Sequence, residues 1–213
     1  MNEFSVQQGS YEWIQERVGF ATASRFKDVM AKLKSGGAAQ ARKDYMAEIV
    51  CECLTGQPVT KFANAAMAWG TETEPEARQA YCIATGNTVD EVSFIKHQSL
   101  RAGASPDGIV NLEGCLEIKC PTSLTHLDTL QMDEVPEQHK AQIQGQMWIT
   151  GYEWCDFVSY DPRLPKGLDM FIRRVYRDDK YIEELQFEVW LFLKEVDERV
   201  AALLSKTYKT EGV

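Results

Sequence analysis

The segment at residues 105–121 constrains the fold more than any other part of this chain. Its sequence, SPDGIVNLEGCLEIKCP, has two apolar runs on either side of the Asn-Leu-Glu-Gly stretch at 111–114. This pattern predicts a β-hairpin with its turn at 111–114. Side chains two positions apart on a strand share a face, so Leu116 and Ile118 are expected on an apolar face and their neighbours on the opposite one.

Three charged residues of the hairpin are expected to meet on that second face. Glu117 and Lys119 alternate with the apolar residues of the second strand, and folding of the hairpin brings Asp107 close to Glu117. The sequence therefore predicts two carboxylates and one ammonium at a single sheet surface.

Such a cluster suits hydrolysis of a phosphodiester. Carboxylate oxygens are ligands for Mg²⁺, which polarises phosphoryl oxygen and lowers the pKa of bound water. An ammonium offsets the charge that develops on the phosphoryl group. A salt-bridge trio on a hairpin surface is the alternative interpretation, because short motifs of this kind recur by chance.

The rest of the sequence changes from helical to alternating periodicity. Helices are predicted at 11–18, from Thr22 or Ser24 to Leu33, at 41–54, 65–85 and 137–150, and as a final amphipathic helix over 182–203. Strands are predicted at 89–97, 108–110, 116–120, 154–160 and 170–176. Helices that flank a central mixed β-sheet make an α/β (α+β) fold, and residues 1–213 are interpreted as one domain, since no repeat or long linker divides them.

Composition excludes several protein classes. With 44% hydrophobic residues the chain can build a core. No apolar run approaches the roughly 20 residues that cross a bilayer, and the polar start lacks the layout of a signal peptide, so we expect a cytoplasmic protein without a membrane partner. The six cysteines contain no CxxC pair and are expected to be reduced thiols rather than disulfides or a zinc site.

Charge is segregated along the chain. The net charge of −9 argues against nucleic acid, but residues 17–43 contain seven basic residues and one acidic residue. This stretch carries +6 and the rest of the chain −15, so positive potential could gather on one face or channel. A solvated basic helix surface is the alternative.

Six blocks of sequence are informative as a set. They are WIQERVGFATAS (13–24), AMAWG (66–70) followed by Glu74, SPDG (105–108), LEIKCP (116–121), AQIQ (141–144) with MW (147–148), and YDPR (160–163). In this order, over nearly the whole chain, they resemble the phage lambda exonuclease and YqaJ-type viral recombinase family of the PD-(D/E)xK nucleases.

This resemblance implies a fold and an activity. The fold would have a restriction-endonuclease-like core. The activity would be that of a metal-dependent exonuclease with Mg²⁺, or Mn²⁺ as an alternative, that degrades the 5′ strand at double-stranded DNA ends and leaves 3′ single-stranded tails. The family further implies a ring-shaped homotrimer around DNA and a single-strand annealing protein as partner in recombination.

The resemblance also implies the catalytic residues. Asp107, Glu117 and the backbone carbonyl of Ile118 match the family's metal ligands, and Lys119 matches its catalytic lysine. Glu74 matches an acidic residue of the same site.

Glu74 and one further catalytic candidate have simpler explanations. Glu74 stands beside Pro75 and could instead be a carboxylate in the first turn of a helix, where it would compensate the helix dipole. Gln142 matches a glutamine expected to touch the water or the DNA, and a solvated helix face is its alternative.

Four residues are expected to bind DNA. Arg17 matches the arginine that holds the 5′-terminal phosphate, for which a forked, permanently charged donor is suited. Ser24 would add a hydroxyl, with helix capping as its alternative. Ser105 precedes the Pro-Asp pair, and Lys34 stands where the family can carry an arginine. His139 stands where relatives can have an aromatic hydroxyl residue, and its role is left open.

Other functions share some of these features. A dimeric endonuclease or junction-resolving enzyme of the same fold is one alternative, and the Arg17–Ser24 block favours end binding over it. A non-catalytic DNA-binding relative is another, and the intact Asp107, Glu117 and Lys119 argue against that. A third alternative is an acidic scaffold protein, which would not bind DNA ends at all.

Overall fold

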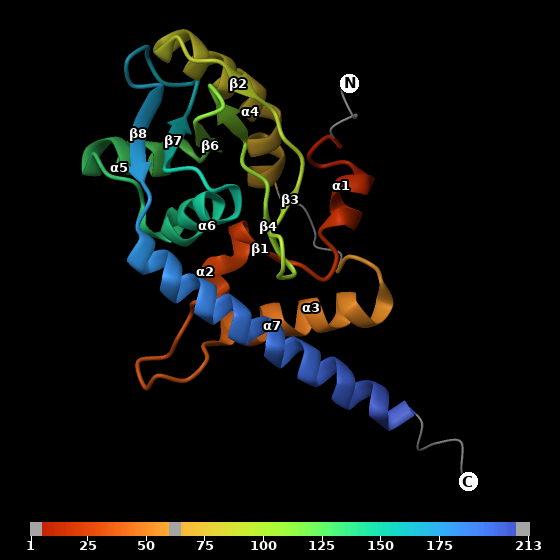
Figure 1. The fold of residues 1–213 in the computed structure, drawn as a ribbon. Coiled ribbons are helices and arrows are strands. Elements are labelled where there is room, and N and C mark those ends of the chain that lie inside the picture. Colours follow the sequence, from red (N-terminus) through yellow and green to blue (C-terminus); the bar gives the residue numbers. More distant parts are fainter. Residues whose placement is uncertain (1–5, 60–64, 208–213) are drawn as a thin grey trace.

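The fold is built on a five-stranded mixed sheet (Figure 1). This computed structural model describes residues 6–59 and 65–207; the first five residues of the polar start lie outside that range. The β6–β7 pair is parallel, and the other neighbours are antiparallel. The sheet runs in the order β2 (Val89–Asp90), β5 (Gly108–Val110), β6 (Gly114–Lys119), β7 (Trp154–Tyr160) and β8 (Met170–Tyr176). The mixed sheet and the 105–121 hairpin are confirmed.

A second, three-stranded sheet corrects one predicted strand. The segment 89–97 is not continuous, because it leaves the first sheet after β2 and joins the second sheet as β3. Between the two, the Val92 carbonyl accepts a hydrogen bond from the side chain of Gln8 instead of pairing in a sheet. Alternating hydrophobicity does not reveal a change of sheet within one segment. The second sheet runs in the order β1 (Ala21–Thr22), β4 (Ala102–Ala104) and β3 (Ile95–Lys96).

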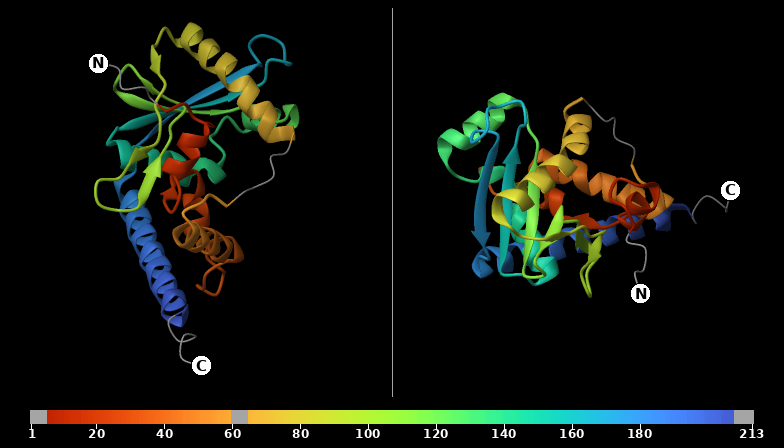
Figure 2. Two further views of the ribbon diagram at one scale, coloured as in Figure 1. Left: turned by 90° about the vertical axis from the view of Figure 1, so that its right-hand side faces the viewer. Right: turned by 90° about the horizontal axis from the view of Figure 1, so that it is seen from above.

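Helices cover both faces of the larger sheet (Figure 1 and Figure 2). Helix α4 packs on one face and α6 on the other, while α7 lies against α3 and α6. The α-helices are α1 (Tyr11–Glu16), α2 (Phe26–Val29), α3 (Gln40–Thr55), α4 (Ala65–Thr85), α5 (Ser123–Met132), α6 (Lys140–Thr150) and α7 (Asp179–Thr207), and the 3₁₀ turns are η1 (Ala23–Arg25) and η2 (Glu137–His139).

Strand β6 has the two-faced character that its sequence predicts. Leu116 and Ile118 pack with Ala77 and Tyr81 of α4. Cys115 packs on the opposite face with α6. Glu117 and Lys119 alternate with the α4-facing residues and therefore lie on the α6 side.

The predicted helix from Thr22 or Ser24 to Leu33 is wrong in length and start. The chain makes one 3₁₀ turn and then a single α-helical turn that ends at Val29. Thr22 occupies the N-cap position without a side-chain capping bond, and Ser24 lies inside the 3₁₀ turn. The Ser24 hydroxyl is thus not used as a cap, and Phe26 and Val29 anchor the short helix in the core.

Other predictions hold with adjustments. Helix α5 was not predicted, and the segment 137–150 begins with the 3₁₀ turn η2 before α6. The apolar stripe of α7 is buried as expected at Ile182, Leu185, Val189 and Val196, but Leu203 is exposed because the end of α7 extends beyond the core (Figure 1).

All six cysteines are free thiols. Across the described residues, no helix combines the length and apolar character of a membrane span.

Candidate active site

The three charged residues of the hairpin meet at one edge of β6. Asp107 stands just before β5, and its backbone N–H donates to the Leu116 carbonyl over 2.9 Å. Its carboxylate accepts the backbone N–H of Ile118 over 2.6 Å. Glu117 is fully buried and forms an ion pair with the ammonium of Lys119, whose side chain is about a third exposed. The predicted convergence is confirmed by this geometry.

Crowded carboxylates dominate the electrostatics here. Loss of water contact raises the pKa of Asp107 well above its ordinary value, and Glu117 and Glu74 raise it further. Burial by itself lowers the pKa of Lys119, but Glu117 and Asp107 outweigh this and leave that pKa raised. Asp107, Glu117 and Glu74 therefore outnumber the two nearby cations, the Lys119 ammonium and the Arg78 guanidinium. This excess of negative charge favours an added cation.

The donor atoms present fit a hard divalent cation. Oε1 of Glu117 is buried, and among the described residues its partner is the Lys119 ammonium. Carboxylate and carbonyl oxygens are the ligands that Mg²⁺ takes in proteins. Within residues 6–59 and 65–207 no three His, Cys, Asp or Glu side chains form a metal-binding group by themselves, so the expected set of Asp107, Glu117 and the Ile118 carbonyl relies on a backbone ligand.

A small polar cavity of about 160 Å³ borders the cluster. Asp107, Glu117 and Lys119 line it, and so do four of the other predicted residues, Arg17, Ser24, Ser105 and Gln142. Gly145 lets α6 reach this position, because a Cβ there would meet the Phe26 ring at 2.4 Å. The tertiary structure thus gathers seven predicted residues around one cavity.

Arg17 lines this cavity, and its polar partner is a hydroxyl group. It donates to the Ser105 hydroxyl over 3.2 Å, and its guanidinium carbon is 3.9 Å from the centre of the Trp13 ring. Trp13 donates to the same hydroxyl over 3.1 Å. In the described part of the chain no acidic side chain forms an ion pair with Arg17, and burial lowers its pKa to about 10. A buried cation of this kind is suited to an anionic ligand.

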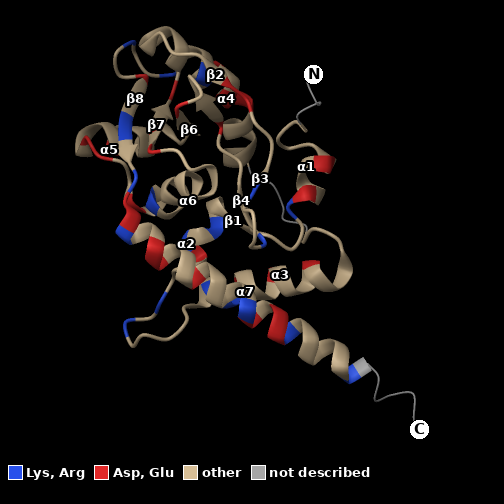
Figure 3. Ribbon diagram, in the orientation of Figure 1, with Lys and Arg blue, Asp and Glu red and all other residues tan. Residues whose placement is uncertain are grey.

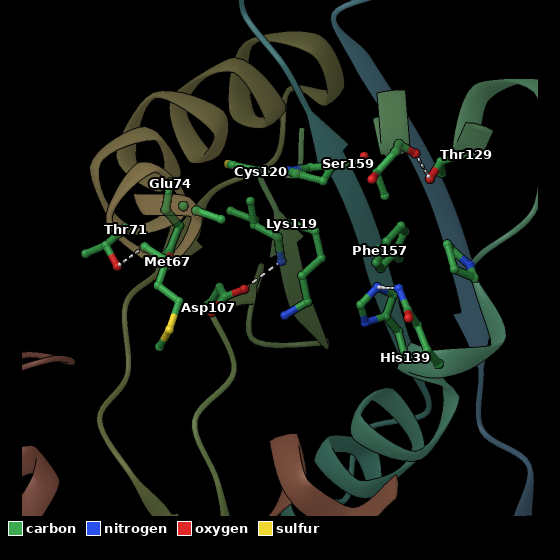
Figure 4. Close-up of a pocket in the computed structure, with 17 residues that line it drawn as sticks. Met67, Thr71, Glu74, Asp107, Lys119, Cys120, Thr129, His139, Phe157 and Ser159 are labelled. Carbon is green, nitrogen blue, oxygen red and sulfur yellow. Dashed lines mark hydrogen bonds between the residues drawn. The ribbon is translucent and has the colours of Figure 1, made fainter. Parts of the chain in front are cut away.

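A larger cavity of about 470 Å³ also borders the cluster (Figure 4). Asp107 and Lys119 line both cavities, and Glu74 lines only this one. Glu74 accepts a hydrogen bond of 2.6 Å from Arg78, which also donates to the Asp107 carbonyl over 3.1 Å. Burial raises the pKa of Glu74, although Arg78 opposes the shift. Glu74 is therefore placed close to the cluster, as expected, but held by an arginine.

Lys34 is not brought to either cavity. It is exposed in the segment between α2 and α3. The basic stretch at 17–43 is also partly neutralised, because Lys32 pairs with Glu188 and Arg42 with Glu195, both on α7 (Figure 3). Arg25 pairs with two carboxylates of its own. The positive face is consequently smaller than the sequence count indicates.

Two functional candidates were missed from the sequence. Gln146 on α6 donates to Glu117 over 2.5 Å and is almost fully buried. Gln8 donates to the carbonyls of Val92 and Pro106 over 2.9 and 2.8 Å and lines the small cavity. Gln146 lies one helical turn from Gln142, a spacing that could have revealed it. No local signal marks Gln8.

The fold and this site together define a protein of the nuclease type with a restriction-endonuclease-like core. The model of the YqaJ-like viral recombinase domain matches residues 12–153, and the chain belongs to that family. The chain is 45% identical to LHK-Exo, an alkaline exonuclease from Laribacter hongkongensis whose crystal structure with dAMP has a TM-score of 0.88, over 94% of this chain and 99% of that one.

A more distant solved structure shows the same fold, and a viral protein matches in sequence. A phage related exonuclease from Haemophilus somnus, 14% identical, has a TM-score of 0.71 over 86% of this chain and 96% of its own. An uncharacterized protein of Acanthamoeba polyphaga mimivirus is 25% identical over 167 residues, which are 72% of this chain and only 29% of the viral protein.

Proposed function

We propose that this protein is a Mg²⁺-dependent 5′-to-3′ exonuclease that acts on double-stranded DNA ends and leaves 3′ single-stranded tails. The observation that carries the proposal is the small cavity, which Arg17 lines together with Asp107, Glu117 and Lys119. Within the described residues the Arg17 guanidinium forms no ion pair with a carboxylate. A cation that holds a terminal phosphate next to a hydrolytic site suits an enzyme that removes end nucleotides. The 45% identity to an alkaline exonuclease supports this reading.

The chain's own residues divide the work. Asp107, Glu117 and the Ile118 carbonyl would hold Mg²⁺, or Mn²⁺ in its place, which supplies charge neutralisation at the phosphate and lowers the pKa of water. The Lys119 ammonium, held in place by Glu117, is positioned to offset charge on the phosphoryl oxygens. Gln146 fixes the orientation of Glu117. Gln142 lines the small cavity, where an amide can hydrogen-bond to the water or a phosphate.

The DNA end would be held by neighbouring groups. Arg17 offers a forked donor to the 5′ phosphate, and Ser105 and Ser24 add hydroxyls. Lys34 would contribute only a distant point charge, because it lies away from both cavities.

Assembly as a ring-shaped homotrimer and cooperation with a single-strand annealing protein are part of the proposal. Both rest on the family membership. Sedimentation at micromolar concentration should give a trimer, and a monomer that still degrades long DNA processively would exclude the ring.

The function is tested with linear and closed-circular duplexes in Mg²⁺, each linear duplex carrying either a 5′ phosphate or a 5′ hydroxyl. We expect release of mononucleotides from the 5′-labelled strand of linear DNA and no loss of closed circles. Cleavage of closed circles would favour the endonuclease alternative. Binding of DNA ends without any cleavage would favour the non-catalytic one.

A further inference from the structure

Two cavities border the catalytic cluster, share Asp107 and Lys119 as lining residues, and differ in chemistry. The smaller one contains Arg17, whereas the larger one has Lys119 as its single cationic lining residue within the described chain. Lys119 is already paired with Glu117. His139 also lines the larger cavity, and burial, with Lys119 and Lys27 nearby, lowers its pKa to about 4, so this ring is neutral at neutral pH. The larger cavity is therefore poorly suited to a second phosphate.

Flat and apolar groups form much of the wall of the larger cavity (Figure 4). The His139 ring stacks on Phe157 with 5.4 Å between ring centres and 29° between planes. Met67 and Thr71 of α4 line the cavity as well, and Met67 is 55% exposed. A volume of about 470 Å³ falls within the usual range for small-ligand sites.

A buried hydroxyl adds a hydrogen-bonding group to this wall. Ser159 lines the cavity, and its Oγ lies 2.7 Å from Nδ1 of the fully buried His126. Nε2 of His126 lies 2.9 Å from the Leu168 carbonyl, which can only accept, so Nε2 carries the proton. The Ser159 hydroxyl then donates to Nδ1, and its remaining lone pairs are available to accept from a ligand.

We propose that the larger cavity binds the nucleoside that follows the scissile phosphate, which is the second nucleotide of the degraded strand, with its base against His139. This inference rests on the proposed function. If the terminal phosphate lies at Arg17 and the scissile phosphate at Lys119, the strand continues past Lys119 into the cavity that Asp107 and Lys119 also line. A wall that carries two carboxylates, one cation already paired with Glu117, and the stacked rings of His139 and Phe157 suits a base and not a phosphate.

The test removes the base rather than the phosphate. A 5′-phosphorylated duplex with an abasic residue at the second nucleotide of the degraded strand is compared with a duplex whose abasic residue lies opposite, in the complementary strand. Both lack the same base pair, but only the first lacks the base that the cavity would bind. The first cleavage in a single turnover with Mg²⁺ should be roughly five- to a hundredfold slower on the first duplex, the range expected for loss of one stacked base.

Three variants decide whether His139 makes this contact. His139→Ala should bring the two rates to within about twofold of each other, and His139→Phe, which keeps an aromatic platform, should restore the difference. His97→Ala is the matched control, because His97 also packs on an aromatic ring, Trp148, with 5.1 Å between ring centres, and does not line the cavity. This variant should keep the wild-type difference.

The possible results separate the inference from the function. Equal rates on the two duplexes in the wild type, or an unchanged difference in His139→Ala, each overturn the inference. Failure of the wild type to degrade an unmodified 5′-phosphorylated duplex overturns the proposed function itself.

Discussion

Two arginines of the basic stretch are expected to respond very differently to substitution. Arg25 is neutralised by Asp28 at 2.5 Å and by Glu48 at 2.8 Å. Arg17 has a hydroxyl and aromatic rings around it, and in the described chain it has no carboxylate within ion-pair distance. We predict that Arg17→Ala abolishes most of the preference for a 5′ phosphate over a 5′ hydroxyl and that Arg25→Ala does not.

The magnitude follows from the contacts that Arg17 can make. Its burial lowers the pKa from 12.5 to about 10, which corresponds to about 3 kcal/mol against the charged form. A phosphate in the cavity would offset that cost. A hydrogen bond to a charged group contributes about 1.5–3 kcal/mol, so loss of the guanidinium should reduce the phosphate-to-hydroxyl rate ratio by about one to two orders of magnitude.

The assay measures the initial rate on 5′-phosphorylated and 5′-hydroxyl duplexes of identical sequence for each protein. Arg17→Lys keeps the charge but loses the forked geometry, and its ratio should be intermediate. If Arg17→Ala retains the wild-type ratio, or if Arg25→Ala lowers the ratio as much, the 5′ end is recognised by other residues.

Three further substitutions test the rest of the site and its support. Asp107→Asn should reduce the cleavage rate about a thousandfold or more, because it removes a charged metal ligand. The fold should stay intact in thermal unfolding, since the asparagine oxygen can still accept the Ile118 N–H. A near-normal cleavage rate would contradict the assignment of Asp107 as a ligand. Gln8→Ala removes two hydrogen bonds that hold the Pro106 segment and should lower kcat about five- to thirtyfold with little change in KM, whereas Gln7→Ala should not alter kcat. Hydrogen bonds from Arg163 hold the pKa of Asp161 at about 2, below its value in the unfolded chain. The Asp161 carboxylate therefore adds about 1–2 kcal/mol to the free energy of unfolding above pH 4, and this contribution disappears as the pH falls towards 2. Urea unfolding at pH 7 and pH 3 should therefore show a smaller pH dependence for Asp161→Asn than for the wild type, and an identical dependence would refute this assignment.

Elements that depend on local pattern could be predicted well from the sequence. The hairpin and the apolar stripe of α7 follow from side-chain periodicity, which neighbouring residues define among themselves. The prediction of one strand at 89–97 is wrong for the same reason, since alternating hydrophobicity fits one long strand and two short strands in different sheets equally well. The helix predicted to run to Leu33 is too long, because burial of Phe26 and Val29 in the core, rather than helix propensity, determines where this helix ends.

By itself the sequence determined which residues of β6 share a face, because alternation along a strand is a local property. It thereby placed Glu117 and Lys119 together, and hairpin closure added Asp107. Only the tertiary structure decided what surrounds them. Arg17 reaches Ser105 across 88 positions of the chain, and Gln146 reaches Glu117 from a separate helix. Contacts between distant segments depend on how helices and sheets pack, and no periodicity within either segment encodes that arrangement.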